Sequence, residues 1–322
     1  MEEKNNKISK GIFILIILII LLLASTYAWF TSSKNVRVDT LNVKVATDGN
    51  LEISVDAINW KTEINSEELL KGIHSTYPNA VNQIPKDGIY PTSTAGVVNS
   101  GKLDMFFGQV QSGNQADTYI LTTTKEKEIH GETGKFITFD IFLKSTQPAT
   151  IYLNSTSSIT SKDNINTSNS TGIENAARIA ILNQGTASSS SAAQNLRGAT
   201  HALIIEPNYD VHTNAGIQNA ENIYGYSGLR ATGNSALSYY GVKTAIATGV
   251  PLNSKSSEYF SIVNPDIKLE KSFFGGETKR QLFKINEGIT KIRVYLWVEG
   301  QDVDCEDMAS GANLNFNLQF TS

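Results

Sequence analysis

The sequence predicts a mainly β fold, built from antiparallel strands with long loops and one or two short helices. Apolar and polar residues alternate in several separate stretches of the chain, and this alternation is typical of antiparallel strands with one buried and one solvated face. Helical periodicity is nearly absent once the hydrophobic N-terminal segment has ended. Both observations favour a β domain preceded by a single apolar helix.

The N-terminal segment has the features of an export signal. Three lysines form a positive head, an unbroken apolar run of 13 residues follows, and Ala28 places a small residue immediately before Trp29. A helix that crosses a bilayer needs roughly 20 residues. We therefore predict a signal peptide, residues 1–28, that is cleaved before Trp29; the alternative is an uncleaved membrane anchor through residues 12–30. In both cases residues 29–322 are extracytoplasmic, either secreted or attached to the cell surface.

Composition limits the classes of partner and of stabilisation. The chain carries 27 Lys and Arg residues against 31 Asp and Glu residues, a net charge of −4, without a cluster of basic residues; this excludes a typical nucleic-acid surface. The single cysteine, Cys305, cannot form an intrachain disulfide. Residues 29–322 can bury a large core, and we predict one β domain with an elaborated loop region at about 154–260.

The predicted strands follow in chain order. A first hairpin is expected over residues 41–55 around the turn signal Asp48-Gly49, and a second over residues 137–154 around a Gln-Pro turn. Residues 292–298 and 314–320 form the last two strands. The final strand has the cleanest pattern, because Leu and Phe at its even positions alternate with Asn and Gln at its odd positions.

Two short helices and two polar loops complete the predicted elements. Residues 66–73 begin with a capping serine and two glutamates, which favours a helix. Residues 172–182 are either a second helix or a turn that leads into a strand over residues 177–182. The low-complexity polar tracts 154–171 and 185–194 are predicted to be surface loops.

An acidic cluster lies between the last two predicted strands. Asp302, Asp304 and Asp307 occur in the Gly-flanked stretch GQDVDCEDMASG. Calcium takes about six to eight oxygen ligands, which such loops can supply outside cells, so these aspartates are the candidate calcium ligands. The spacing is not that of an EF-hand loop. The alternative interpretation is a solvated loop without a metal.

Other catalytic chemistry finds little support. The motifs HExxH, GxSxG, SxxK, GxGxxG and GxxxxGK[ST] do not occur, so common signatures of zinc peptidases, serine hydrolases and nucleotide-binding proteins are missing. A loop could bring His201, Glu206 and His212 to one metal ion, but their spacing matches no metal signature. Histidines with local hydrogen bonds are the ordinary alternative.

An aromatic-rich junction after the apolar segment is followed by a short predicted strand and a G-x-L-x-I strand; the residues concerned are Ala28, Trp29, Phe30, Thr31, Gly49, Leu51 and Ile53. This pattern resembles exported Gram-positive proteins of the camelysin and biofilm-matrix fibre group. The C-terminal stretch KIRVYLWVEGQDVDC is also similar to a segment that recurs in uncharacterised exported proteins of Firmicutes. The resemblance implies a jelly-roll-like β-sandwich and transfers no functional residue.

Several functions remain open at this point. The absence of catalytic motifs favours a structural or interaction protein of the cell surface or extracellular matrix, whose partners are its own copies or related matrix proteins. Residues 29–45 could complete a neighbour's sheet by strand donation or fold back as an edge strand of their own domain. The alternatives are an exported hydrolase, as the camelysin name suggests, and a monomeric wall-polymer or carbohydrate-binding module with a pocket in residues 201–250.

Overall fold

The protein is described by a computed structural model, and the described residues are mainly β, as predicted. The ranges are 35–45, 51–65, 67–69, 77, 80–115, 118–161, 172–207, 239–269, 279–305 and 311–322. The signal segment, including Ala28, Trp29 and the alternative anchor at residues 12–30, lies outside them, so export and cleavage stay predictions. In the described part, no helix has the length and apolar character needed to cross a membrane.

The first sheet has six strands and contains both ends of the described chain. Its order is β18-β10-β20-β1-β3, and β11 also pairs with β20. The bounds are β1 (Arg37–Val45), β3 (Glu63–Ile64), β10 (Ala149–Asn154), β11 (Ser158–Ser161), β18 (Lys279–Ile285) and β20 (Asn313–Thr321).

The second sheet has ten strands and follows the order β15-β8-β7-β4-β19-β12-β13-β17, with β9 between β19 and β2. Its strands are β2 (Leu51–Ser54), β4 (Pro91–Ser93), β7 (Met105–Ser112), β8 (Tyr119–Glu126), β9 (Ile137–Ser145), β12 (Ala177–Ala187), β13 (Leu203–Pro207), β15 (Ile246–Pro251), β17 (Ile267–Leu269) and β19 (Gly288–Glu299). Two further strand pairs belong to neither of these sheets. They are β5 (Val98–Asn99) with β6 (Lys102–Leu103), and β14 (Tyr239–Val242) with β16 (Phe260–Val263).

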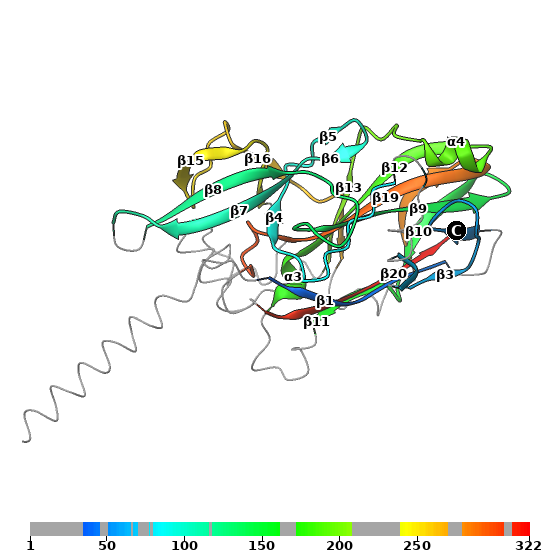
Figure 1. Ribbon diagram of the computed structural model, residues 1–322, viewed down its shortest axis with the longest axis horizontal. Helices are drawn as coiled ribbons and strands as arrows, with labels where there is room; N and C mark the ends of the chain where they lie inside the picture. The colour runs from blue at the N-terminus through cyan, green and yellow to red at the C-terminus, as the bar shows by residue number, and fades with distance from the viewer. Residues whose placement is uncertain are drawn as a thin grey trace, which may run out of the picture.

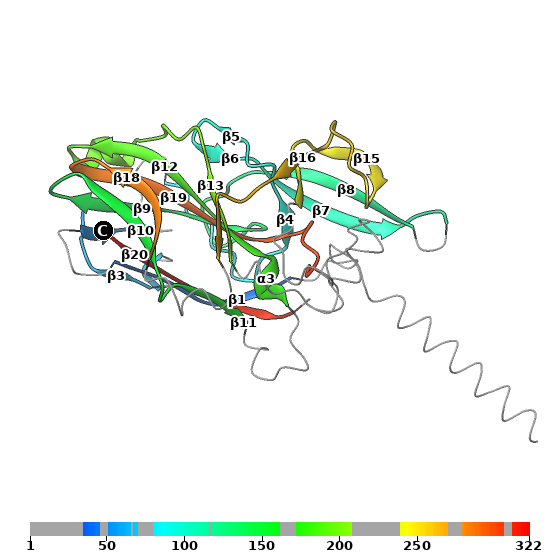
Figure 2. The same cartoon turned by 180° about the vertical axis from the view of Figure 1, so that it is seen from behind.

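The apolar faces of the two sheets share one continuous core. Phe316 and Phe320 of β20 are buried in it together with Phe139 of β9 and Val294 of β19. Figures 1 and 2 show the two sheets as stacked layers, from which β7, β8 and β15 extend to one side. The prediction that the even positions of the last strand face the core is confirmed.

The sheets are mixed, which corrects the prediction of purely antiparallel strands. β1 pairs with β20 in parallel, as β13 does with β17 and β19 with β4. A parallel pair needs a crossover connection between its strands. Alternation along one strand shows which face is buried, but it carries no information on the direction of the neighbouring strand.

Both predicted hairpins are wrong. β1 belongs to the first sheet and β2 to the second, while β9 belongs to the second sheet and β10 to the first. In each case the chain crosses from one layer to the other, so the two apolar faces meet across the core and do not lie side by side. The Gln147-Pro148 signal lies between β9 and β10, whereas Asp48-Gly49 lies outside the described residues. A turn signal of either kind cannot distinguish a hairpin from a crossing between sheets.

The helices and polar tracts also differ in part from expectation. The stretch from residue 172 forms a single helical turn, α3 (Ile173–Ala176), and continues directly as β12, as the turn-to-strand alternative predicted. Each polar tract contains a regular element: β11 in the first, and α4 (Ser190–Gln194) in the second, capped by Ser189. Of the helix predicted over residues 66–73, the described residues 67–69 are helical.

Candidate functional site

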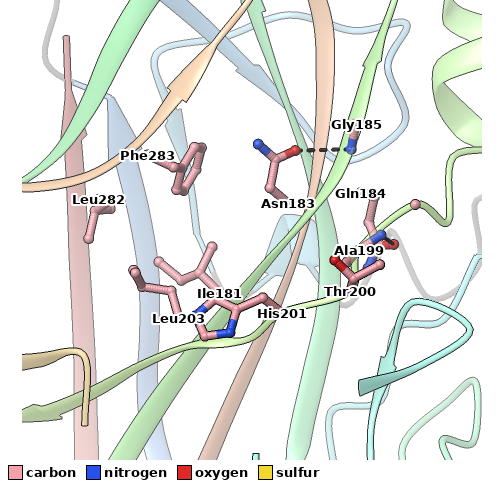
Figure 3. Close-up of a pocket in the computed structure, with 11 residues that line it drawn as sticks. Ile181, Asn183, Gln184, Gly185, Ala199, Thr200, His201, Leu203, Leu282 and Phe283 are labelled. Atoms are coloured by element: carbon pink, nitrogen blue, oxygen red, sulfur yellow. Dashed lines mark hydrogen bonds between the residues drawn. The ribbon is translucent and has the colours of Figure 1, made fainter. Parts of the chain in front are cut away.

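An open groove of about 480 Å³ lies at the seam between the two sheets (Figure 3). One wall is formed by β12 and β13, which pair only as far as Ile181 and Leu203 and then separate. Leu282 and Phe283 of β18, at the edge of the first sheet, form the facing wall. The groove therefore exists because one strand pair ends early while the other sheet continues past it.

The rim of the groove is polar, and its backbone is held in place. Gln184 donates its side-chain amide to Gly101 O (2.8 Å), and Gly198 N donates to Gln184 O (3.0 Å), which fixes the loop that leads toward His201. Asn183 accepts a hydrogen bond from Gly185 N (2.9 Å) through Oδ1, and its amide nitrogen points toward the Phe283 side (Figure 3). The described lining contains no Asp, Glu, Lys or Arg.

The predicted histidine set is only partly described, and its described members have different surroundings. The His201 side chain is 71% exposed, with Nε2 located 3.5 Å from Asp266 Oδ1. Glu206 is buried and forms an ion pair with Arg178 (2.7 Å), while His212 lies outside the described residues. Glu206 therefore serves as an internal partner of Arg178.

The described residues of the acidic loop after β19, 301–305, are buried, which corrects the solvated-loop interpretation for this part of the loop. Asp302 and Asp304 are 5% and 0% exposed. One carboxylate oxygen of Asp302 accepts from the Arg178 guanidinium, and the other accepts from Asp304 N (2.8 Å). The burial is possible because Arg178 compensates the charge of Asp302. Asp307 lies outside the described residues.

Calcium binding by this loop stays a prediction. Among the residues that the structure describes, no group of three or more His, Cys, Asp or Glu side chains could hold a metal ion. Because Asp302 already uses both oxygens for protein donors, a calcium site here would have to compete with Arg178 for that carboxylate.

Glu299 lies at the end of β19 beside the same arginine. It is fully buried and accepts hydrogen bonds from Trp297 Nε1 (3.0 Å) and Gln301 N (3.1 Å). Burial raises the pKa of Glu299 to about 7, although these donors and the nearby Arg178 act in the opposite direction. We therefore expect Glu299 to lose its proton only near neutral pH.

A second buried ionic cluster lies on the outer face of the second sheet. Asp140 of β9 binds the Arg293 guanidinium through both oxygens (2.7 and 3.0 Å), contacts Lys291 Nζ (3.1 Å) and accepts from the Tyr77 hydroxyl (2.9 Å). Burial alone would raise the pKa of Asp140, but Arg293 and Lys291 reverse this effect and hold it below its usual value. Burial lowers the pKa of Lys291, which Asp140 partly restores.

The sequence analysis missed both ionic clusters and the groove. One signal was available, since Arg178 and Arg293 occur within otherwise apolar strand sequences (AARIAIL and IRVYLWV), where a charge is rarely buried without a partner. The sequence does not identify that partner, because Arg178 and Asp302 are 124 positions apart.

Comparisons with protein-family models, with curated proteins and with solved structures found no match. The resemblance to the camelysin and biofilm-matrix fibre group therefore stays a prediction that rests on the quoted junction residues.

Proposed function

We propose that this protein is an exported structural protein of the cell surface or extracellular matrix, folded as a jelly-roll-like β-sandwich. Its partners are further copies of itself or related matrix proteins, and β1 is the element that joins them by strand donation. The proposal combines the export signal read from the sequence with the position of β1 in the first sheet.

The pairing of the two terminal strands is the observation that carries this proposal. β1 pairs with β20 from Arg37–Asn313 to Val45–Phe320, with one shift of register between Val38 and Thr40. The two strands form the one parallel pair described in a sheet whose other described pairs are antiparallel. β1 lies between β20 and β3, so it is an inner strand of the sheet. This corrects the alternative expectation that residues 29–45 form an edge strand. Without β1, one edge of β20 loses its partner.

The contacts that hold β1 can be reproduced by an identical strand. Leu41, Val43 and Val45 enter the core with at most 4% exposure, and the backbone of β1 is paired with that of β20. The described ion pair of β1, Lys44 with Glu63, has both side chains more than 40% exposed and contributes little. A β1 from another copy would supply the same side chains and the same backbone groups.

Donation from one copy to the next is a heterologous contact. When its rotation does not close, such a contact produces an open filament. In strand addition the backbone bonds provide affinity, and alternate side chains set the register. The proposed assembly is therefore a fibre whose subunits repeat the β1–β20 pairing between chains.

A peptide competition tests this proposal on the mature chain, residues 29–322. Light scattering and electron microscopy should show polymers that shorten when a peptide of residues 36–45 is added. A matched peptide with Leu41→Asn and Val43→Asn should have no effect, because it cannot fill the core. A mature chain that stays monomeric at high concentration would falsify the proposal.

A further inference from the structure

We propose that the groove between β12, β13 and β18 binds a ring of a neutral sugar chain. The inference goes beyond the proposed assembly, because the groove lies at the β18 edge of the first sheet and uses no residue of β1 or β20. Binding and assembly can therefore be tested separately.

The shape of the groove matches one or two sugar rings in size and polarity. Its volume, about 480 Å³, is within the range of roughly 300–1,000 Å³ that is usual for small-molecule sites. Ile181, Leu203, Leu282 and Phe283 provide apolar walls, and the other lining side chains are polar or small. A sugar ring has the corresponding surface, because its C–H face is apolar and its edge carries hydroxyl groups.

Phe283 is the aromatic residue suited to pack against the C–H face. It is partly buried against the main core, which holds the ring in one orientation at the groove (Figure 3). An aromatic ring provides a large apolar area at low entropic cost, since it has only two side-chain torsions. Leu282, beside it, is nearly fully buried and provides apolar support.

The rim provides hydrogen-bonding groups at fixed positions. Asn183 has its Oδ1 occupied by Gly185 N, which leaves the amide hydrogens directed toward the groove. Thr200 adds a hydroxyl group, and His201 adds an imidazole nitrogen. The Asn183 amide hydrogens can only donate, whereas the Thr200 hydroxyl can both donate and accept, so the groove can serve both kinds of contact with a sugar hydroxyl.

The charge of the lining excludes several other ligand classes. Because the described lining holds no Asp, Glu, Lys or Arg, a phosphate or carboxylate would find no fixed cation, and a cationic ligand would find no carboxylate. A charged group that is desolvated without a partner is strongly disfavoured. The lining therefore favours a neutral ligand, and its combination of apolar walls with amide, hydroxyl and imidazole groups favours one that carries hydroxyl groups.

Saturation-transfer NMR on the mature chain tests the inference with two soluble probes, tri-N-acetylglucosamine and maltotriose. We expect transfer to the ring protons of at least one probe. Thr200→Trp, which places an indole over the exposed rim, should weaken binding by about tenfold, a change of about 1.4 kcal/mol. Phe283→Leu should weaken it less, since it keeps apolar volume but removes the aromatic face.

The matched control is Thr160→Trp, which introduces the same side chain at an exposed position of β11 away from the groove. This variant should bind as the wild type does, and all variants should keep the wild-type melting temperature within a few degrees. Absence of transfer to both sugars would overturn the inference. Equal transfer in Thr200→Trp and in the wild type would also overturn it, because the sugar would then bind elsewhere.

Discussion

The two sheets differ in how they hold their strands. The second sheet buries charged side chains on its strands, among them Asp140, Arg178, Lys291, Arg293 and Glu299, each at most 2% exposed. The first sheet buries mainly apolar side chains on one face and leaves Asn and Gln partly exposed on the other.

This difference bears on the proposed strand donation. Removal of a strand from the second sheet would leave charges buried without their partners, which costs several kcal/mol per charge. Removal of β1 from the first sheet would break backbone bonds and apolar contacts, and in the proposed assembly the β1 of another copy would restore them. On this proposal the second sheet is a fixed scaffold, and β1 of the first sheet is the strand that is exchanged.

The largest expected effect comes from removing the buried Asp140 carboxylate from the second sheet. Asp140→Ala leaves Arg293 and Lys291 buried without their shared carboxylate, so we expect a loss of about 3–5 kcal/mol in the free energy of unfolding, measured with urea. The control in the first sheet is Glu63→Ala, whose ion pair with Lys44 (2.8 Å) has both side chains more than 40% exposed and should contribute less than about 1 kcal/mol. Similar losses in both variants would remove the distinction between the sheets.

The first sheet should respond to apolar truncation on one face only. Phe316→Ala removes a fully buried ring from the core and should cost roughly 3–5 kcal/mol. Asn315→Ala changes the partly exposed opposite face and should cost little. Thermal melts of both variants measure the difference. Equal destabilisation would mean that β20 is buried on both faces, as β19 is.

Glu299 should make the free energy of unfolding depend on pH between about 4.5 and 7. Burial raises its pKa to about 7 from 4.5, so the folded protein keeps this proton where the unfolded chain has lost it. The resulting stabilisation is complete below about pH 4.5 and is lost as the pH rises through 7, with a total of about 3 kcal/mol. Urea titrations at pH 5 and pH 8 should show this loss in the wild type.

The matched variant is Glu299→Gln, which keeps the side-chain shape and cannot titrate. Its stability should change much less between pH 5 and pH 8 than that of the wild type. Glu63→Gln, at an exposed position of β3, should retain the wild-type loss. If the stability of the wild type, Glu299→Gln and Glu63→Gln changes equally with pH, Glu299 is not the group responsible.

The smallest expected effect concerns calcium at the acidic loop. If the ion binds, saturating calcium should raise the melting temperature by mass action, by about 2–4 °C for each 1 kcal/mol of added stability. Asp304→Asn should abolish this increment. An unchanged melt with calcium and with chelator would leave Asp302 as a partner of Arg178 alone.

The sequence predicted which faces of individual strands are buried, because that information is local. The terminal strand from Asn313 to Thr321 and the even positions of residues 292–298 are oriented as their alternation predicted. The assignment of strands to sheets was not predictable, since a turn such as Asp48-Gly49 is compatible with a hairpin and with a crossing between layers. The groove could not be predicted from the sequence either, because Leu203 and Phe283, on its facing walls, come together only when both sheets have formed.

The proposed exchange of β1 between chains is tested most directly by mixing two variants of the protein that each carry one added cysteine. Asn42 of β1 and Asn317 of β20 are paired in register on the partly exposed face, at a separation typical of neighbouring strands and suitable for a disulfide. Native Cys305 is fully buried and can remain in place. Mature Asn42→Cys and Asn317→Cys chains are mixed, oxidised under native conditions and separated on a non-reducing gel.

We predict a disulfide-linked product that contains one chain of each kind. The control mixture combines Asn42→Cys with Thr160→Cys, which lies on β11, a strand that does not pair with β1, and it should give only background cross-linking. A mixture of the Asn42→Cys and Asn317→Cys chains that cross-links no more than this control would show that β1 stays in its own sheet, and would contradict assembly by strand donation.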